Sequence, residues 1–578
     1  MKKISCLIIP LAIVFCYVSC TKGFEEKNQD PYGITKVDPG LLFTGAERGM
    51  NVGNWDGEQT IVQQYLNAYN SGATAGFQFN EDVDQYNMPR WGVSTSVIKP
   101  LVQIISLIKD DPASKNLYNM VRIWKAYAYM TLVDTYGDVP YSEAGKGYLE
   151  GINYPKYDKM ADIYADLYNE LKTATAALSA SNEYVSSDLF FGGATSSSPA
   201  LITAQVAHWK KIGYSLMLRL GMRYSKIDAT KAASIAQEAF TGGVILLNSD
   251  NVVVTQYNTT VPNGFSNQQR TINTFNYYLA EPFVNQLKST NDPRLKYIGA
   301  SYANPANITT TRDTVTANQY GFPVGYDQVS VLNYPGYRGT KGGGQNYTQL
   351  NYGVVASSVA PAFFITNSQN QLLLAEAKYK GWITGGLNAQ QYYEAGVKAA
   401  MDEWNLFPGT FSPAIFDVEK NNYLLQPAIA YNEAKALELI NTQYWIESIT
   451  NGAEAFANWR RSGFPVLQPN KYNNNLNGGF VRRMAYPNAE EAQNPDNYRA
   501  AVASMGGDGL TQRIFGINHD ETTLLIVDSL ILYSIINFNS KNVFEIFKQK
   551  TIAFRNIIKH STDSIFVVFR VIFRQQTK

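Results

Sequence analysis

The sequence predicts a mostly α-helical fold, in which tetratricopeptide-like helical hairpins carry a long loop-rich insertion. The first observation is the helical spacing of apolar residues in segments on both sides of the insertion: 94–110, 115–136, 157–180, 203–226, 229–241, 366–383, 388–405 and 431–450. The second is the composition of residues 248–360, which are rich in Gly, Asn, Thr and Tyr, with a helical pattern mainly at 275–288. We therefore expect a rigid helical scaffold that presents a variable, functional surface of loops.

The hairpin prediction depends on pairs of neighbouring helical segments. Residues 372–381 end on Gly381, and a short turn leads to residues 389–400, where Ala and Gly alternate with Tyr. Small residues between large aromatic ones allow two helices to approach closely, as they do in tetratricopeptide-like repeats. Residues 203–241 repeat this pattern less clearly.

The N-terminus has the pattern of a secretory signal peptide over residues 1–19. Lys2 and Lys3 precede an apolar stretch, residues 4–18, which is shorter than the roughly 20 residues needed to span a bilayer. Ser19 then precedes Cys20, which resembles a lipobox, although Tyr17 stands where Leu is usual. We predict that Cys20 is lipidated and becomes the mature N-terminus, in preference to simple secretion, and that it anchors the protein to a membrane.

The cysteine content agrees with an anchored, exported protein. Cys6, Cys16 and Cys20 are the three cysteines of the chain, so after processing no intrachain disulfide is possible and stability has to come from core packing. Residues 20–60, which include Asp30-Pro31 and Asp38-Pro39, predict an anchor followed by an extended tether. Residues 61–515 are then expected to form the body, which a looped segment, 463–515, closes.

The last 63 residues differ from the body. From Ile517 to Lys578 there is no Gly, Pro or Trp, although the whole chain has 43 Gly and 23 Pro. Such a change of composition inside one domain is unusual, so we predict that the tail, residues 516–578, is not part of the evolved fold, in preference to a fused helical extension. The net charge of +1 and the 17% of charged residues give no indication of a nucleic-acid partner.

Most catalytic signatures are missing from the sequence. There is no HExxH, GxSxG or phosphate-binding loop. His208 is the only histidine before the tail, and we expect it to have a structural role. We predict no catalytic residue, no metal site and no cofactor. The Gly-rich stretch 336–344 and the acidic turn around Asp82 and Asp84 are expected to be surface loops. Carboxylates are numerous, so a glycoside hydrolase is not excluded.

Aromatic residues are the positive functional signal, since the chain has 39 Tyr and 8 Trp. A flat ring covers the apolar face of a sugar, and burying about 100 Å² of apolar surface contributes about 2.5 kcal/mol before costs. An aromatic side chain is more often part of a core than of a ligand platform. The candidates outside the predicted helical cores are Trp55, Tyr86, Trp91, Tyr326, Tyr334 and Tyr337, with Arg90 and Arg338 as polar partners.

Several segments together resemble the SusD/RagB family of nutrient-binding outer-membrane lipoproteins. The combination of DTYGDVPY at 134–141 with WRRSGFP at 459–465 is the most specific. Others in the same order are residues 121–129, 157–171, 209–223, 375–377, 443–446, 482–487, Glu490 and Asn494. The resemblance covers about 20–515 and implies a SusD-like α/α superhelix with a lipidated Cys20. Its motifs look like scaffold, so they transfer the fold better than the ligand.

The resemblance also implies a function. Such proteins are thought to act as lids that deliver oligosaccharides, or peptides in some members, to a SusC-like TonB-dependent barrel in the outer membrane. We therefore expect a non-enzymatic glycan-binding protein, lipid-anchored in the outer membrane and facing outward. The alternatives are a peptide-binding member of the same system, a surface glycoside hydrolase, and a purely structural lid without a ligand.

Overall fold

Helices make up most of the described chain, which in this computed structural model comprises residues 37–51, 57–69, 84–258, 260–266, 274–409, 415–469, 476 and 479–515. Its contacts divide the chain into two units, Met1–Asn518 and His519–Lys578, and every described residue belongs to the first. The predicted signal peptide, Cys20, Trp55 and the tail lie outside the described residues.

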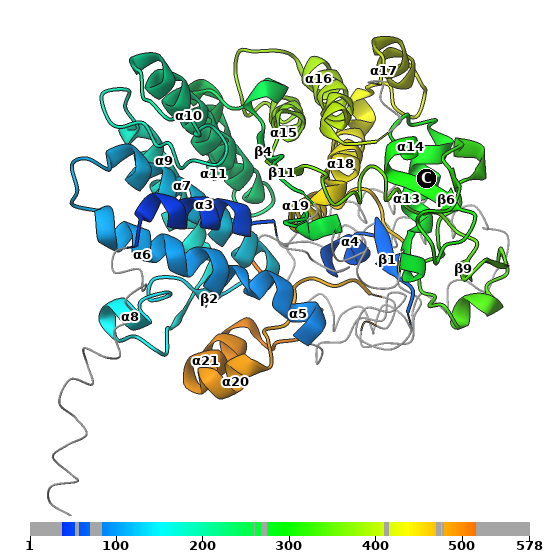
Figure 1. Cartoon of the computed structure of the whole chain (residues 1–578), viewed down its shortest axis with the longest axis horizontal. Helices are drawn as coiled ribbons and strands as arrows, with labels where there is room; N and C mark the ends of the chain where they lie inside the picture. Colours follow the sequence, from blue (N-terminus) through cyan, green and yellow to red (C-terminus); the bar gives the residue numbers. More distant parts are fainter. Residues whose placement is uncertain are drawn as a thin grey trace, which may run out of the picture. The chain divides into compact units, whose positions relative to one another are not determined.

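The first half of the body is a series of helices (Figure 1). In chain order they are α3 (Pro39–Gly49), α4 (Gly57–Ile61), α5 (Asp84–Trp91), the π-helix η2 (Ser94–Ile98), α6 (Lys99–Ile108), α7 (Lys115–Tyr136), α8 (Gly147–Glu150), α9 (Met160–Ala177), α10 (Pro199–Arg223) and α11 (Ala229–Gly242).

Helices resume inside and after the loop-rich insertion. They are α13 (Glu281–Ser289), α14 (Leu295–Ile298), the 3₁₀ turn η6 (Ser330–Asn333), α15 (Asn367–Tyr379), α16 (Ala389–Asp402), α17 (Asp417–Leu424), α18 (Ala436–Glu447), α19 (Gly452–Ser462), α20 (Ala489–Gln493) and α21 (Pro495–Met505). The prediction of a mostly helical fold is therefore confirmed.

Helices α15 and α16 form the clearest hairpin, as the sequence predicts, and lie beside each other in Figure 1. Each begins with a capping box, at Thr366 with Gln369 and at Asn388 with Gln391, which satisfies backbone N–H groups that the helix leaves free. A Cβ atom on Gly396 would lie 2.8 Å from Leu372 Cγ. The two helices therefore pack at a distance that only glycine permits.

The pair α10 and α11 repeats this arrangement. A Cβ atom on Gly221 would lie 2.9 Å from Ile235 Cγ2, so glycine again allows the close approach. Helix α7 packs against both α9 and α10, and Trp124 of α7 and Trp209 of α10 are completely buried. This packing of large side chains forms the core that a disulfide-free body requires.

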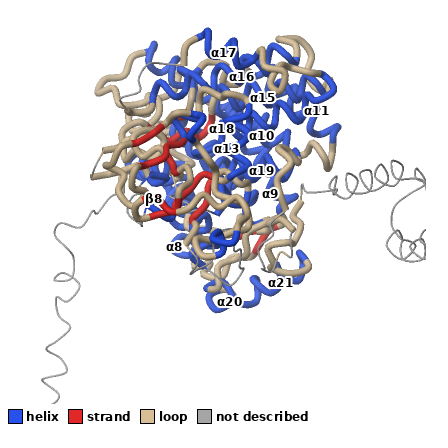
Figure 2. The backbone as a smooth tube through the Cα atoms, turned by 90° about the vertical axis from the view of Figure 1, so that its right-hand side faces the viewer, coloured by secondary structure: helices blue, strands red, loops and turns tan. Residues whose placement is uncertain are grey.

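The described strands are short and pair in small antiparallel sheets of two or three strands; Figure 2 shows most of them (red) among the loops. β1 pairs with β5, with Tyr65 opposite Leu279, so the N-terminal part of the body is joined to the insertion. The strands are β1 (Tyr65–Asn67), β2 (Val139–Pro140), β3 (Tyr157–Asp158), β4 (Val252–Val254), β5 (Tyr277–Leu279), β6 (Gly299–Tyr302), β7 (Arg312–Asp313), β8 (Thr340–Lys341), β9 (Gly344–Gln345), β10 (Gln349–Leu350) and β11 (Ala362–Ile365).

The prediction of an extended tether through residue 60 is wrong for α3 and α4. Asp38 does not mark a simple turn but the start of α3, because its carboxylate accepts the N–H of Gly40 at 2.7 Å and Pro39 follows at the first helical position. Such a Pro is preorganised for a helix start. Phe43 and Ala46 of α3 are fully buried, so the body begins before residue 61.

Two other boundaries differ from the prediction. The predicted helix at 275–288 is the strand β5 followed by α13, whose Pro282 lies in the first turn. The predicted looped segment 463–515 contains α20 and α21. The helical stretch 88–108, which runs from α5 to α6, is long and apolar enough to cross a membrane by length and composition. In the structure α6 buries Leu101 and Ile104 in the core, and a core helix of a globular protein passes the same test.

Candidate functional site

Four of the predicted site residues lie on one group of loops in the insertion. We call Tyr320, Tyr326, Tyr334, Tyr337 and Arg338 the tyrosine loop cluster. The rings of Tyr326 and Tyr334 meet edge to face with centroids 5.1 Å apart. Both are half-buried, whereas Arg338 is exposed. Exposed Val329 and Leu332 lie on the turn between these two tyrosines, so this surface is both aromatic and apolar.

Hydrogen bonds fix two of these rings from below. The hydroxyl of Tyr334 donates to Glu281 Oε1 at 3.0 Å, and that of Tyr337 donates to Gln345 Oε1 at 2.9 Å. Burial, and then the negative charge of Glu281, raise the pKa of Tyr334, so its hydroxyl stays protonated and remains a donor. The rings are therefore held in place before any ligand arrives, which reduces the entropy cost of binding.

The turn between Tyr326 and Tyr334 is also fixed. Asp327 Oδ1 accepts the N–H groups of Val329 at 2.8 Å and Ser330 at 2.6 Å, an Asx-type cap that starts η6. The N–H of Gln328 donates to the carbonyl of Ala68 at 2.7 Å. This bond attaches the turn to the end of β1.

A layer of buried rings supports the cluster. Tyr278 and Phe322 stack with centroids 5.3 Å apart, and Tyr347 contacts Phe322 at 5.1 Å. All three are buried, and the hydroxyl of Tyr278 accepts the N–H of Gln345 at 2.8 Å. Aromatic contacts of this kind are stabilising beyond the area that they bury, so the loops rest on a small core of their own.

Arg90 and Trp91, also predicted for the site, have partners inside the helical body instead. Arg90 is buried, and its Nε lies 3.0 Å from Glu58 Oε1. The indole N–H of Trp91 donates to Glu490 Oε1 at 3.2 Å, and its ring packs on Tyr136, Tyr157 and Tyr486. We therefore leave both out of the candidate site. Tyr86 lies in α5, but its side chain is outside the described residues, as is Trp55.

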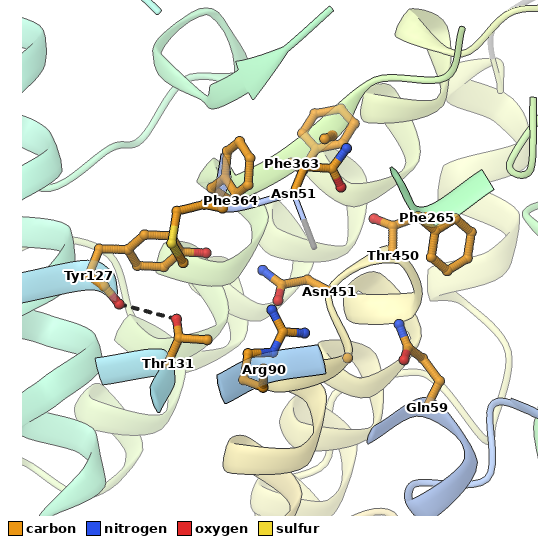
Figure 3. A pocket seen from close by; sticks show the side chains of 13 residues that line it. Asn51, Gln59, Arg90, Tyr127, Thr131, Phe265, Phe363, Phe364, Thr450 and Asn451 are labelled. Carbon is orange, nitrogen blue, oxygen red and sulfur yellow. Dashed lines mark hydrogen bonds between the residues drawn. The ribbon is translucent and has the colours of Figure 1, made fainter. Parts of the chain in front are cut away.

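Arg90 also lines a small cavity, in which Figure 3 shows the side chains of Asn51, Gln59 and Asn451 around it. The free volume is about 30 Å³, which suits water molecules rather than a sugar. The buried Oε1 of Gln59 has no hydrogen-bond partner among the described residues, so we expect it to bind such a water. The other lining residues are Met50, Tyr127, Thr131, Phe265, Ala362, Phe363, Phe364, Thr450 and Gly452.

His208 has contacts typical of a structural histidine. Its ring stacks on Phe191 with centroids 4.2 Å apart, and its Nδ1 lies 3.1 Å from Asp250 Oδ1. Burial lowers its pKa. Within the part of the chain that the structure describes, no three His, Cys, Asp or Glu side chains gather as a metal site would require.

One residue of the cluster, Tyr320, was missed by sequence reasoning. It is 38% exposed, and the guanidinium carbon of Arg338 lies 3.3 Å from its ring centroid. Its position in Tyr320-Gly321-Phe322-Pro323, within the loop-rich insertion, was the available signal. Sequence separation hid its contact with Arg338.

Comparisons with known proteins identify the fold family. The family model described as "Starch-binding associating with outer membrane", SusD-like, matches residues 31–487. Among curated proteins no sequence matches the chain.

Solved structures give the same assignment. A chitin-binding protein is 28% identical with a TM-score of 0.69, over 83% of this chain and 100% of that one. A SusD-like protein of Bacteroidetes AC2a is 25% identical with the same TM-score, over 84% and 100%. A SusD homologue of Bacteroides uniformis, 22% identical with a TM-score of 0.63 over 83% and 99%, shares the fold. The chain therefore belongs to the SusD-like family.

Proposed function

We propose that the protein binds an oligosaccharide on the tyrosine loop cluster, without cleaving it. The observation that carries the proposal is a preorganised group of half-buried rings: hydrogen bonds hold Tyr334 and Tyr337, and an edge-to-face contact with Tyr334 holds Tyr326. Ring faces cover the apolar faces of sugars, and neighbouring hydroxyl and guanidinium groups bind their hydroxyls. The family description and the chitin-binding relative support a glycan rather than a peptide.

The direct test is binding of the purified full chain to a panel of oligosaccharides and peptides, measured by calorimetry. We expect affinity for at least one glycan class and none for the peptides. Tyr326→Ala should weaken that binding by about tenfold, because a ring that covers about 60 Å² contributes about 1.5 kcal/mol. Tyr148→Ala is the matched control, since Tyr148 is 91% exposed but lies on α8.

The outcomes separate the alternatives. Affinity for peptides alone would replace the glycan by a peptide, and release of reducing ends from a bound oligosaccharide would make the protein a glycoside hydrolase. Binding of neither ligand class would leave a structural lid. Equal effects of Tyr326→Ala and Tyr148→Ala would move the site away from the loop cluster.

We also propose that Cys20 is lipidated, that the protein faces outward from the outer membrane, and that it delivers its ligand to a SusC-like TonB-dependent transporter. The support is the lipobox-like Ser19-Cys20 and the outer-membrane association in the family description. Cys20→Ala should abolish incorporation of labelled palmitate and release the protein from outer membranes. Co-purification with a barrel of the TonB-dependent class from detergent-solubilised membranes tests the partner.

A further inference from the structure

Two cations lie over one ring of the tyrosine loop cluster. The guanidinium carbon of Arg338 is 3.3 Å from the ring centroid of Tyr320, and Nζ of Lys288 is 3.9 Å from it. The negative face of an aromatic ring attracts a cation at such distances. Because both cations cover Tyr320, this ring is not a sugar platform like Tyr326. It is a support that holds positive charge at the surface.

The backbone of Tyr320 is held firmly. Its N–H donates to Thr348 Oγ1 at 2.7 Å, and its carbonyl accepts the N–H of Thr348 at 2.8 Å. The next residue, Gly321, lies so close to the backbone of Glu281 that a Cβ atom would be 2.4 Å from the Glu281 Cα. The position of the ring that the two cations cover is therefore set by the fold.

Neither cation is neutralised within the described chain. No described carboxylate forms an ion pair with Arg338 or Lys288, and the acids of the surrounding loops have other partners: Glu281 accepts the Tyr334 hydroxyl, and Asp327 caps its own turn. Lys288 donates to two neutral carbonyls, of Ala317 at 2.8 Å and of Gln319 at 2.9 Å. Two like charges on one ring are unfavourable for folding, which suggests that they are retained for a ligand.

We propose that Arg338, assisted by the charge of Lys288, binds an anionic substituent of the glycan, a carboxylate or a sulfate. The preferred ligand would then be an acidic oligosaccharide, whose rings lie on Tyr326 and Tyr334. This inference rests on the proposed function, because it names the ligand class of the same surface.

The two cations have different roles. An arginine that stacks through its planar face keeps its N–H edge free, and that edge matches the two oxygens of a carboxylate or sulfate. Lys288 already donates to two carbonyls, so it contributes mainly charge. Arg338 is therefore the specificity-determining residue, and a lysine in its place keeps the charge but loses the paired hydrogen bonds.

The test compares neutral and acidic hexasaccharides with the purified full chain. The neutral probes are chitohexaose and maltohexaose, and the acidic ones are hexagalacturonate, which carries carboxylates, and a chondroitin sulfate hexasaccharide, which carries both anions. We expect at least one acidic probe to bind about tenfold more tightly than either neutral one. The affinity for this acidic probe should decrease when the salt concentration is raised from about 50 mM to about 300 mM, because salt screens exposed charges.

Variants of Arg338 then locate the effect. Arg338→Gln should weaken binding of the acidic probe by about tenfold and that of neutral probes by clearly less, because only the acidic probe loses charged, paired hydrogen bonds, whereas Arg338→Lys should fall between. Arg499→Gln is the matched control, because Arg499 is an exposed arginine of α21 whose side chain is 64% accessible. It should bind every probe as the wild type does.

The outcomes are distinguishable from failure of the proposed function. Tighter binding of a neutral probe than of both acidic ones, or equal losses for acidic and neutral probes in Arg338→Gln, would overturn the anion site while glycan binding stands. Competition by a hexaglutamate peptide, with no sugar bound, would overturn both. The salt dependence of binding is measured on the wild-type protein. It therefore tests the anion site even if Arg338→Gln does not fold.

Discussion

The centre of the helical scaffold and the tyrosine loop cluster both place arginines beside tyrosines, but Arg219 and Arg223 of the scaffold form ion pairs with a buried carboxylate, whereas Arg338 of the cluster forms none with the described carboxylates. In the scaffold, Glu454 of α19 lies 2.8 Å from Arg223 and 3.4 Å from Arg219, both of α10. Arg223 also lies 3.2 Å from Asp134 of α7. In the loop cluster, Arg338 lies over a ring and stays exposed. The buried charges join helices, whereas the exposed one lies on a ring at the surface.

A second buried pair joins α15 to α19. Arg461 binds Glu376 with two parallel bonds, of 2.7 and 2.8 Å. Burial alone would raise the pKa of Glu376, but the charge and hydrogen bonds of Arg461 outweigh it and the pKa lies below its ordinary value. The pKa of Glu454 is lowered in the same way by Arg219 and Arg223 against the effect of burial.

The buried ion pairs of the scaffold explain why the family resemblance transfers the fold but not the ligand. Asp134, Arg223, Glu376 and Arg461 come from four of the motif segments and are far apart in the sequence. They meet in the core, where an unpaired charge is costly. The loop cluster contains none of these motifs, so its residues can differ between members without loss of the fold.

The largest expected effect separates these two regions. Arg461→Ala leaves the carboxylate of Glu376 buried and without its cation, so we expect the free energy of unfolding to fall by about 3–5 kcal/mol. Denaturant unfolding followed by circular dichroism measures this loss. Where the variant remains folded, its glycan affinity should be that of the wild type.

The matched control replaces both partners. The double variant Glu376→Leu with Arg461→Met removes the pair without leaving a charge behind, so it should be more stable than Arg461→Ala. If Arg461→Ala is as stable as the wild type, the buried scaffold charges are dispensable for folding and do not differ in this respect from the exposed Arg338.

A smaller effect is expected beside Tyr320, at the point where the loop cluster lies against α13. Gly321→Ala places a Cβ atom 2.4 Å from Glu281 Cα and 2.6 Å from Glu281 N, so the backbone has to shift. We expect a loss of about 1–3 kcal/mol in unfolding free energy, together with weaker glycan binding, because Tyr320 follows the shift. Thermal unfolding and calorimetry on one sample measure both.

Gly45→Ala in α3 provides the control for that substitution. A Cβ atom on Gly45 meets nothing within 4 Å, so alanine should stabilise this helix by about 0.5–1 kcal/mol and leave binding unchanged. Unchanged binding in Gly321→Ala would mean that the position of Tyr320 does not matter for the ligand.

The hairpins could be predicted because their signals, apolar periodicity and small residues at helix contacts, lie within short stretches of sequence. Periodicity located α7 at residues 115–136, as the structure has it, and Gly396 indicated the close approach of α15 and α16. Helix α21 was missed inside the predicted looped segment 463–515, although Pro495 at its start and Gly506 after its end are ordinary boundary signals.

The site was harder to predict than the fold for a physical reason. Trp91 and Tyr326 both lie outside the predicted helical cores, yet Trp91 packs among Tyr136, Tyr157 and Tyr486, whereas Tyr326 faces loops. Which ring is covered depends on segments far away in the chain, such as Glu490 for Trp91. The sequence alone contains no short-range signal that separates these cases.

A pH-dependent effect should arise in the scaffold and not in the loop cluster. Burial, and then the charge of Glu447, raise the pKa of Glu403 well above its ordinary value. A raised folded-state pKa contributes stability that is complete below the ordinary value of about 4.5 and is lost as the pH rises through the folded pKa. Glu403→Gln keeps the oxygen that accepts the Ser368 hydroxyl and cannot ionise.

We therefore expect Glu403→Gln to gain stability relative to the wild type at pH 8 more than at pH 5, by about 1.4 kcal/mol for each unit of raised pKa that this window covers. Denaturant unfolding at the two pH values measures the difference. Glu438→Gln, an exposed carboxyl of α18, should leave the pH profile unchanged. A parallel profile for Glu403→Gln and the wild type would exclude Glu403 as its source.

The smallest effect on stability is expected from the loss of one tyrosine hydroxyl in the loop cluster, and the same change in the scaffold serves as its comparison. Tyr334→Phe removes the bond to Glu281 in the loop cluster, at 3.0 Å, and Tyr444→Phe removes the bond to Glu454 in the scaffold, at 2.7 Å. Glu281 is partly exposed, so water replaces the lost donor and we expect a cost of about 0.5 kcal/mol. Glu454 is buried, so its loss should be about 1–3 kcal/mol. Equal costs in paired unfolding experiments would mean that burial does not distinguish the two regions, and that the loop cluster is as closed to solvent, and hence to a ligand, as the scaffold.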